Sequence, residues 1–245
     1  VYTNAYPVLA SRNLVASCAM PASDGMVIHT NTHKVRNARR HVVELLLSEH
    51  NADCTKCYKN TKCELQELAS EMVITEPMFI DLVPGKNYST DQQSPSIIKD
   101  DSKCIRCQRC VRTCHELQHV SALGVAYKGD HMKISTFFEN PMYDVVCTNC
   151  GQCVNRCPTG ALIERNYVDE VWDAIYDKTK HVIVQTAPAV RVALGEELGF
   201  DVGERVTGKM VTALKRIGFD SVLDTDFTAD LTIMEEGTEL LTRLK

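Results

Sequence analysis

The sequence predicts a multidomain α+β protein, and two observations carry this prediction. Eleven of the 12 cysteines fall in three tight groups between residues 54 and 157. The stretch from residue 166 to residue 245 has no cysteine and alternates between strand-like and helix-like patterns, as the opening of an α/β domain does. We therefore expect cysteine-rich domains followed by an incomplete α/β domain.

Composition and charge narrow the class of protein. The 245-residue chain has no apolar run near the roughly 18 residues of a membrane span, so we expect a soluble protein without a transmembrane segment. Disulfide-stapled secreted scaffolds are short and rarely repeat CxxC steps, which favours metal binding in a reducing compartment. The net charge of −5 arises from the C-terminal part, where 15 acidic and 9 basic residues follow residue 165. The basic stretch at 34–40 favours a solvated helix face, so no nucleic-acid partner is expected.

The second and third cysteine groups, "CIRCQRCVRTC" and "CTNCGQCVNRCP", repeat the pattern CxxCxxCxxxC. Three thiolates on a tight loop suit three iron corners of a 4Fe-4S cubane, and the fourth reaches the sister cluster. Incidental cysteines and two zinc ribbons fit this spacing less well. The pattern resembles a bacterial-type two-cluster ferredoxin, although His115 stands where a proline would follow Cys114. We expect one cluster to be held by Cys104, Cys107, Cys110 and Cys157, and the other by Cys147, Cys150, Cys153 and Cys114.

The first group, "HNADCTKCYKNTKC", places His50 ahead of Cys54, Cys57 and Cys63. In isolation this pattern fits a zinc site equally well. Beside a two-cluster ferredoxin, it favours a third 4Fe-4S cluster with one histidine and three cysteine ligands. A neutral imidazole leaves the cluster less anionic, so its reduction potential should exceed that of a similar all-cysteine site. The alternative is a surface histidine at the end of the helix predicted for "VRNARRHVVELLLSEH".

Four features follow one another along the chain: a lone cysteine in "LVASCAMP", a predicted helix, the histidine and cysteine group that ends in "CELQELA", and the two-cluster ferredoxin pattern. Together they resemble the accessory region of FeFe hydrogenases, and the early part resembles G-type iron-sulfur subunits of complex I and some formate dehydrogenases. The resemblance implies that Cys18 is the last of four ligands to a 2Fe-2S cluster, which forms only if three upstream cysteines exist. It also implies four domains. Residues 1–33 are a remnant of a plant-ferredoxin-like 2Fe-2S domain, and residues 34–98 form a 4Fe-4S domain with one histidine and three cysteine ligands. Residues 99–166 form a two-cluster ferredoxin domain, and residues 167–245 form the N-terminal part of the H-cluster domain.

The C-terminal segment also carries the resemblance. "HVIVQTAPAVRVALGEELG" predicts a buried strand, a turn at Pro188 and an amphipathic helix, and the segment from Gly208 onward predicts helix, strand and helix. The amino-acid sequence of this segment is similar to the start of the hydrogenase catalytic domain. This implies that Ala187, Pro188 and Ala189 line the pocket of the H-cluster.

The helix with "MEEGTELLTR" places Glu236, Glu239 and Arg243 on one face, at steps of three and four residues. The resemblance implies that glutamates of this segment relay protons to the active site, and we add the arginine. Spacing alone favours an exposed charged face with an ion pair.

The resemblance implies an electron relay that passes electrons between an external carrier and the H-cluster for reversible dihydrogen formation. The cysteines that bind the H-cluster in the family, in segments TSCCPxW, MPCxxK and ExMACxxGC, are not in this chain, so we expect that it does not activate hydrogen alone. We expect a fragment, and the alternative is a relay subunit descended from a hydrogenase. The expected partner is a ferredoxin or a flavin- or NAD(P)H-oxidising subunit of a larger complex, in the cytoplasm or in a hydrogenosome or mitochondrion-derived organelle. The alternatives are a complex I-like or formate-dehydrogenase-like electron-transfer subunit and a zinc-binding interaction protein.

Overall fold

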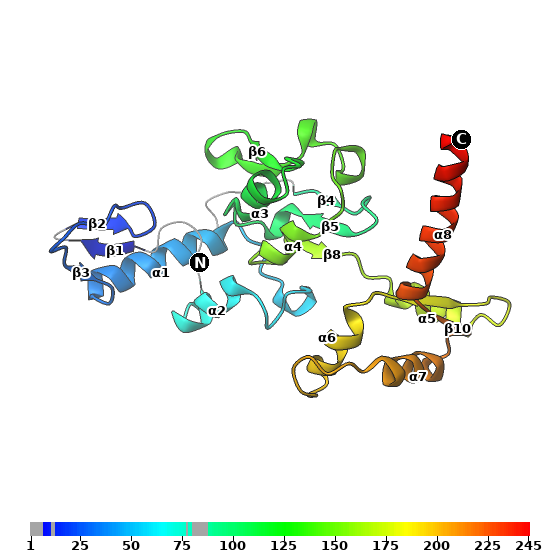
Figure 1. Ribbon diagram of the computed structural model, residues 1–245. Coiled ribbons are helices and arrows are strands. Elements are labelled where there is room, and N and C mark those ends of the chain that lie inside the picture. Colours follow the sequence, from blue (N-terminus) through cyan, green and yellow to red (C-terminus); the bar gives the residue numbers. More distant parts are fainter. Residues whose placement is uncertain (1–6, 11–12, 77, 80–87) are drawn as a thin grey trace. The chain divides into compact units, whose positions relative to one another are not determined.

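The computed structural model describes residues 7–10, 13–76, 78–79 and 88–245 (Figure 1). The chain forms two compact units, Val1–Arg165 and Asn166–Lys245. Both units combine helices with short strands, which confirms the predicted mixture of helix and sheet. Parts of two predicted domains lie outside the described residues: 1–6 and 11–12 of the first, and 77 and 80–87 of the second.

The first unit begins with a small antiparallel sheet in the order β2-β1-β3. β1 pairs with β2 along four residues and with β3 along two. The strands β2 and β3 are joined by the turn that contains Cys18. The strands are β1 (Pro7–Ala10), β2 (Asn13–Ala16) and β3 (Ile28–His29).

Helix α1 (His33–Ser48) confirms the helix predicted ahead of the first cysteine group. It begins at Thr32, whose hydroxyl oxygen accepts a hydrogen bond from the N–H of Val35 at 3.3 Å. Threonine is a preferred residue at this capping position. The helix ends two residues before His50, so it delivers this histidine from its C-terminal end.

A second antiparallel sheet, in the order β4-β5-β8, organises the cysteine-rich core. β5 leads into the first ferredoxin-type motif and β8 follows the second, so their pairing brings the two ends of the repeat together. The core beneath them contains Ile97, Leu123, Met142 and Leu162 together with Cys110 and Cys153. The strands are β4 (Thr90–Asp91), β5 (Ile97–Asp100) and β8 (Leu162–Glu164).

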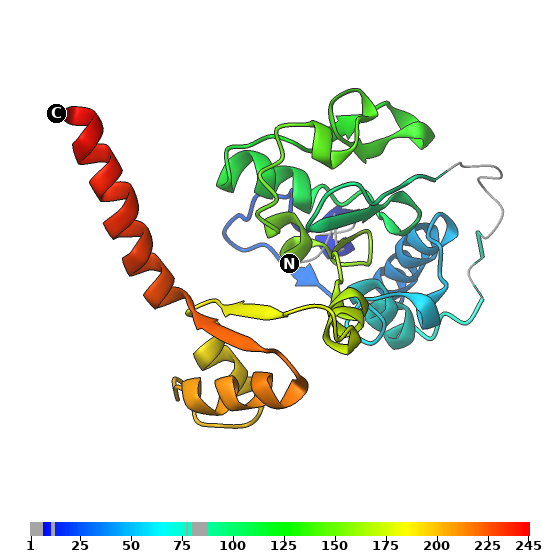
Figure 2. The same cartoon turned by 90° about the vertical axis from the view of Figure 1, so that its right-hand side faces the viewer.

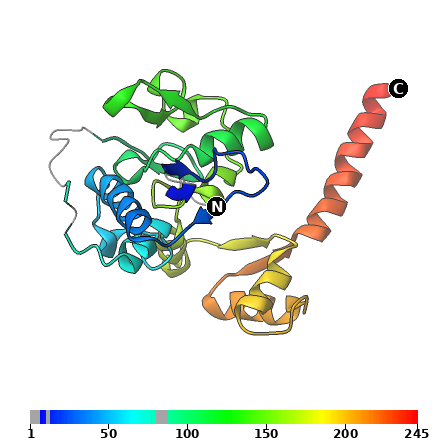
Figure 3. The same cartoon turned by 90° about the vertical axis from the view of Figure 1, so that its left-hand side faces the viewer.

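Short helices and one hairpin complete the first unit. The hairpin of β6 and β7 lies between the two cysteine motifs in sequence. In all three views it is at the top of the unit and α2 at the bottom, with the second sheet between them (Figures 1, 2 and 3). The bounds are η1 (Cys54–Lys56), α2 (Glu64–Glu71), η2 (Asp101–Lys103), α3 (Arg109–Arg112), the π-helix η3 (Thr113–Leu117), β6 (Gly124–Ala126), η4 (Gly129–His131), β7 (Lys133–Ser135), η5 (Phe137–Glu139), η6 (Met142–Asp144) and α4 (Gln152–Arg156).

The second unit contains a parallel pair of strands, β9 and β10, connected through two helices. The predicted succession of strand, turn, helix, helix, strand and helix is confirmed. The prediction that the first strand is buried is wrong, because Ile183 is 53% exposed. Within the described residues this strand pairs with β10 alone, so neighbouring strands do not cover it. The bounds are α5 (Val168–Tyr176), β9 (Ile183–Thr186), α6 (Val190–Glu197), α7 (Thr207–Ile217), β10 (Ser221–Asp224) and α8 (Thr225–Leu244).

None of the helices in the described ranges is both long and apolar enough to cross a membrane.

Candidate iron-sulfur cluster sites

The first candidate site is a small cavity, partly open to solvent, in the cysteine-rich core. Three of its cysteines come from the first ferredoxin-type motif, on the loop after η2 and on α3. The fourth comes from the C-terminal end of α4, 47 residues beyond the last of the three. The cysteines that line the cavity are Cys104, Cys107, Cys110 and Cys157.

The second candidate site is a similar small cavity, also partly open to solvent. Its first three cysteines come from the second motif, and the fourth projects from the π-helix η3 after the first motif. The fourth cysteine of each motif therefore lies with the first three cysteines of the other. The cysteines that line this cavity are Cys114, Cys147, Cys150 and Cys153.

The electrostatics of both cavities favour a bound cation. Burial raises the pKa of the Cys104 thiol to about 11 and that of Cys153 to about 12. The charges of neighbouring sulfurs contribute to these raised pKa values, Cys157 to that of Cys104 and Cys147 to that of Cys153. Such thiols become thiolates only beside a positive centre, because crowded negative charges repel one another. Iron suits this requirement, since soft sulfur ligands select iron-sulfur clusters.

The two motifs also share an unusual main-chain geometry. Arg106 and Asn149 occupy the same place in each repeat and have φ angles of 57° and 56°. Gln108 and Gly151 are the next equivalent pair, with φ angles of 60° and 74°. These left-handed residues curl each loop so that main-chain N–H groups face the sulfurs, where they favour the thiolate form. The donated hydrogen bonds are Arg106 N–H to Cys104 Sγ at 3.4 Å and Asn149 N–H to Cys147 Sγ at 3.5 Å.

The two motifs differ where the fourth cysteine leaves its helix. α4 stops ahead of Cys157, and Pro158 follows, which has no N–H to continue a helix. After Cys114 the next residue is His115, and the chain continues as a π-helix to Leu117. The expected departure at His115 is therefore a local change of helix type. Cys114 still reaches the second cavity.

The third candidate site is built from the first cysteine group. Cys54 begins η1, and Cys63 caps the N-terminus of α2. Burial raises the pKa of the Cys63 thiol, and main-chain N–H groups of Gln66 and Leu65 oppose the rise. The charges of Cys57 and Cys54 also raise it.

His50 has the environment of a ligand. Its Nδ1 atom is buried and has no hydrogen-bond partner among the described residues. Burial lowers the pKa of the ring, and a hydrogen bond to the main-chain carbonyl of Lys103 opposes this. A histidine that binds a metal through one nitrogen commonly donates the other N–H to such a carbonyl. The orphaned nitrogen therefore fits a histidine ligand better than a surface histidine.

Two further observations concern the cysteines. Cys18 lies exposed in the turn after β2. Across the ranges that the structure describes, no three His, Cys, Asp or Glu side chains converge on a point that would hold a single metal ion. The eight ferredoxin-type cysteines line two cavities instead.

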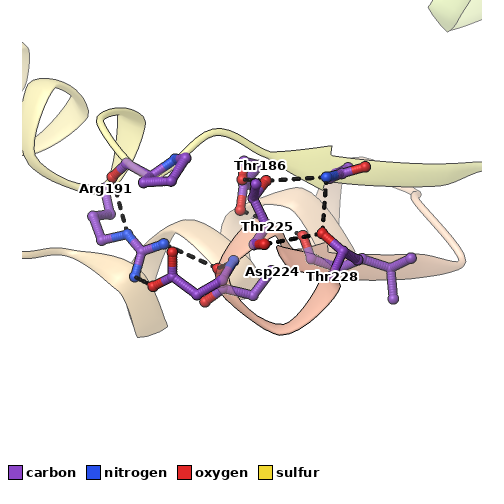
Figure 4. A network of polar contacts seen from close by, with 9 residues as sticks. Thr186, Arg191, Asp224, Thr225 and Thr228 are labelled. Atoms are coloured by element: carbon purple, nitrogen blue, oxygen red, sulfur yellow. Dashed lines mark hydrogen bonds and ion pairs between the residues drawn. The ribbon is translucent and has the colours of Figure 1, made fainter. Parts of the chain in front are cut away.

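In the second unit, Ala187, Pro188 and Ala189 form an exposed turn between β9 and α6. Arg191 holds this turn in place (Figure 4), and sequence reasoning missed this residue. Its Nε atom donates to the carbonyl oxygen of Pro188 at 3.0 Å. Its guanidinium also bonds two carboxylates at the start of α8: Asp224 at 2.9 Å and Asp226 at 3.1 Å.

Threonines complete the polar network at the carboxyl ends of β9 and β10 (Figure 4). The hydroxyl of Thr225 donates to the carbonyl oxygen of Thr186. The amide of Gln185 donates to the hydroxyls of Thr225 at 3.2 Å and Thr228 at 3.1 Å. The stretch "DTD" at the start of α8 could have predicted this network, because aspartate and threonine favour helix N-termini.

The three residues predicted for proton relay lie on α8 and are exposed. Arg243 and Glu239 form an ion pair one turn apart. Glu236 shares their face by helical spacing. The structure thus joins two of the three, in the arrangement that spacing alone predicted.

Three features define a ferredoxin-like iron-sulfur protein. Each motif shares its fourth cysteine with the other cavity, the loops direct main-chain N–H groups at the sulfurs, and the pairing of β5 with β8 joins the two ends of the repeat. Three family models match parts of the chain. Residues 94–163 match the ferredoxin-like domain of NADH-quinone oxidoreductase subunit 3, and residues 39–77 match the NADH-ubiquinone oxidoreductase-G iron-sulfur binding region. Residues 180–245 match the C-terminal domain of the iron only hydrogenase large subunit.

Curated relatives agree with these matches. The NADP-reducing hydrogenase subunit HndD of Solidesulfovibrio fructosivorans is 53% identical over 95% of this chain and 40% of its own length. Iron hydrogenase 1 of Clostridium pasteurianum is 36% identical over the same shares. A G-type subunit of the NADH-quinone oxidoreductase of Rhizobium meliloti (strain 1021) is 38% identical over 66% of this chain and 19% of its own length.

Among solved structures, an NAD+-reducing [NiFe]-hydrogenase in the H2-reduced state is similar, with a TM-score of 0.60 and 28% identity over 65% of this chain and 67% of that one. The chain spans about 40% of the length of the two hydrogenase relatives. The predicted resemblance to FeFe hydrogenase large subunits, and more distantly to the G-type iron-sulfur component of complex I, is confirmed. The chain is an iron-sulfur protein related to oxidoreductases of the hydrogenase type.

Proposed function

We propose that this chain is the iron-sulfur electron relay of an FeFe hydrogenase. It passes electrons between an external carrier and the H-cluster, where two protons and two electrons form dihydrogen reversibly. The observation that carries the proposal is the exchange of fourth cysteines, with Cys157 lining the first cavity and Cys114 the second. The match of residues 180–245 to the hydrogenase model favours a hydrogenase over other electron-transfer proteins.

Each cavity holds one 4Fe-4S cluster, which supplies one-electron redox chemistry when bound. The thiolates orient the cluster, and the loop N–H groups lower the negative charge on the sulfurs. Cys110 and Cys153 are each 8% exposed, so the chain excludes water from the inner side of both sites. Cys110 of the first site and Cys153 of the second lie in the same buried core cluster, so the two sites are neighbours. Neighbouring sites suit electron transfer between them.

The third site holds a further 4Fe-4S cluster through His50, Cys54, Cys57 and Cys63. Its neutral histidine ligand raises the reduction potential relative to an all-cysteine site. The carbonyl of Lys103 faces His50 and directly precedes Cys104 of the first cavity. This proximity supports electron exchange between the third site and the first. Cys18 contributes to a 2Fe-2S cluster only together with cysteines beyond those of this chain.

The second unit provides one wall of the H-cluster pocket and a route for protons. Ala187, Pro188 and Ala189 form the wall, and Glu236, Glu239 and Arg243 hold and pass protons at their exposed helix face. Carboxylates bridged by water can exchange protons. The H-cluster itself binds to the remainder of the complete enzyme.

The electron carrier is a ferredoxin or a flavin- or NAD(P)H-oxidising subunit of a larger assembly. The name of the relative HndD, an NADP-reducing hydrogenase subunit, supports the second choice. A cytoplasmic location, or a hydrogen-producing organelle, remains a prediction.

Iron analysis tests the proposal first. The anaerobically purified chain should contain about twelve iron atoms and as many acid-labile sulfides, as three 4Fe-4S clusters require. Zinc without iron or sulfide would establish the zinc-binding alternative. The complete protein, loaded with its H-cluster, should make or consume dihydrogen, and loss of Cys114 or Cys157 should each remove one cluster.

A second candidate is a complex I-like or formate-dehydrogenase-like electron-transfer subunit. The matches of residues 39–77 and 94–163 to complex I models favour it. Purification of the native protein decides between the two. Quinone reductase or formate-oxidising partners in fixed stoichiometry, with no hydrogen turnover by the complete loaded protein, would replace the hydrogenase proposal.

A further inference from the structure

Gly160 lies where the third cysteine site meets the first. It is buried and follows Cys157 by three residues. A Cβ atom placed on Gly160 would lie 2.6 Å from the Sγ atom of Cys57, inside the contact distance of two atoms. No side chain therefore fits at residue 160 while Cys57 keeps its position.

The two sides of this contact are held by other bonds. Thr159, 1% exposed, donates from its hydroxyl to the carbonyl oxygen of Lys103 at 2.7 Å. The same lysine approaches the imagined Cβ of Gly160 at 3.3 Å, but only through its flexible side chain. Two main-chain hydrogen bonds tie the segments together: Glu64 N–H to Pro158 O at 3.1 Å and Asn51 N–H to Ser102 O at 2.8 Å. An added methyl group must therefore displace Cys57.

We propose that Gly160 is a positioning residue for the third cluster site. Its missing side chain lets the Cys57 sulfur rest against the loop that carries Cys157, and so sets where Cys57 binds its cluster. The proposal rests on the proposed function, because it assigns Cys57 to a 4Fe-4S cluster. The packing around a ligand sulfur tunes the reduction potential, so displacement of Cys57 must change it.

The effect expected of a substitution is steric. Gly160 is not among the glycines in the left-handed region, so alanine adopts its main-chain conformation without strain. Gly124 provides a matched control in the same unit. It also lies outside the left-handed region, and a Cβ there would meet nothing within 4 Å.

The test uses the chain purified anaerobically with its clusters, as wild type, Gly160→Ala and Gly124→Ala. Iron and sulfide are measured, and reduction is followed by electron paramagnetic resonance across a redox titration. In Gly160→Ala, the signal that His50→Cys also alters should shift its midpoint potential, or disappear with about a third of the iron. The other two signals and all signals of Gly124→Ala should match the wild type.

If Gly160→Ala loses every cluster, the same substitution is tested in a chain that also carries Cys57→Ala. In Cys57→Ala the clashing sulfur is gone, so adding Gly160→Ala should change neither the remaining signals nor the urea midpoint of unfolding. A further loss of stability there overturns the proposal, because the glycine would then act without Cys57. A Gly160→Ala chain that carries all three clusters and titrates like the wild type overturns the positioning role of Gly160 but leaves the proposed function standing. A wild-type chain without iron-sulfur clusters overturns the proposed function as well.

Discussion

Arg109 and Glu64, 45 residues apart in the sequence, form a two-point ion pair with Nη1 to Oε1 at 2.7 Å and Nη2 to Oε2 at 2.8 Å. Arg109 begins the helix that carries Cys110, and Glu64 follows Cys63. The pair therefore joins the first candidate site to the third. Planar arginine and carboxylate groups match in this geometry, which fixes orientation as well as distance.

Arg109→Ala should lower the free energy of unfolding by about 1 kcal/mol, because Glu64 is 38% exposed and water screens part of the pair. It should also speed the loss of iron from the third site, since α2 is then less firmly held. Urea unfolding and iron release measured over time check both effects. Arg112→Ala, at the last position of the same helix, is the control and should leave both unchanged. Equal behaviour of the two variants would refute the linking role.

Gly151→Ala should lower the free energy of unfolding by about 1 kcal/mol, because its φ of 74° disfavours any side chain. Nothing lies within 4 Å of its imagined Cβ, so the cost is conformational. The equivalent residue in the first motif, Gln108, already bears this cost at φ 60°. Gln108→Gly should therefore stabilise the chain by a similar amount. Denaturant unfolding measures the change in the free energy of unfolding for each variant. If the two changes have the same sign, residues 108 and 151 do not have equivalent main-chain roles.

Asp100 should make stability depend on pH. Burial alone would raise the pKa of its carboxyl, but hydrogen bonds from Ser102 and Lys103 and the Lys103 charge hold it below its usual value. A carboxyl with a lower pKa in the folded state stabilises the fold above its unfolded pKa of about 3.9. This stabilisation disappears as the pH falls through that value toward the folded pKa.

Asp100→Asn should therefore lower the free energy of unfolding by about 1 kcal/mol at pH 7, with a smaller difference from wild type at pH 3. Urea unfolding followed by circular dichroism at both pH values measures the two differences. Asp144→Asn, at an exposed position, is the control. A difference that stays constant between pH 7 and pH 3 would rule out the linkage.

His50→Cys should lower the potential of one cluster and leave the other two nearly unchanged. The thiolate adds a negative charge where the imidazole is neutral, and this stabilises the oxidised cluster. A redox titration followed by electron paramagnetic resonance measures all three. If the titration is unaltered, His50 is not a ligand.

Glu239→Gln in the complete enzyme should slow hydrogen turnover by roughly 10- to 100-fold without removing iron, because the amide cannot carry a proton. Hydrogen production and iron content are measured together. Asp230→Asn is the matched control, because nine residues place it on the opposite face of α8. Normal turnover by Glu239→Gln would mean that Glu239 and Arg243 form only an exposed ion pair.

The sequence by itself predicted the cysteine sets, and it determined the helix ahead of His50 and the order of elements after residue 166. These features depend on spacing along the chain: repeated CxxC steps, apolar periodicity, and turn residues such as Pro188. The proline after Cys157 and the histidine after Cys114 also predicted that the two motifs differ after their fourth cysteines. They did not predict the π-helix that follows Cys114.

Only the tertiary structure decided the contacts between distant segments. The pairing of β5 with β8, the ion pair of Arg109 with Glu64 and the contact of Gly160 with Cys57 join residues that no local pattern connects. The exposure of Ile183 was likewise beyond prediction, because the number of strands beside β9 is a property of the folded sheet. Local spacing selects ligands and elements, whereas packing selects which of them meet.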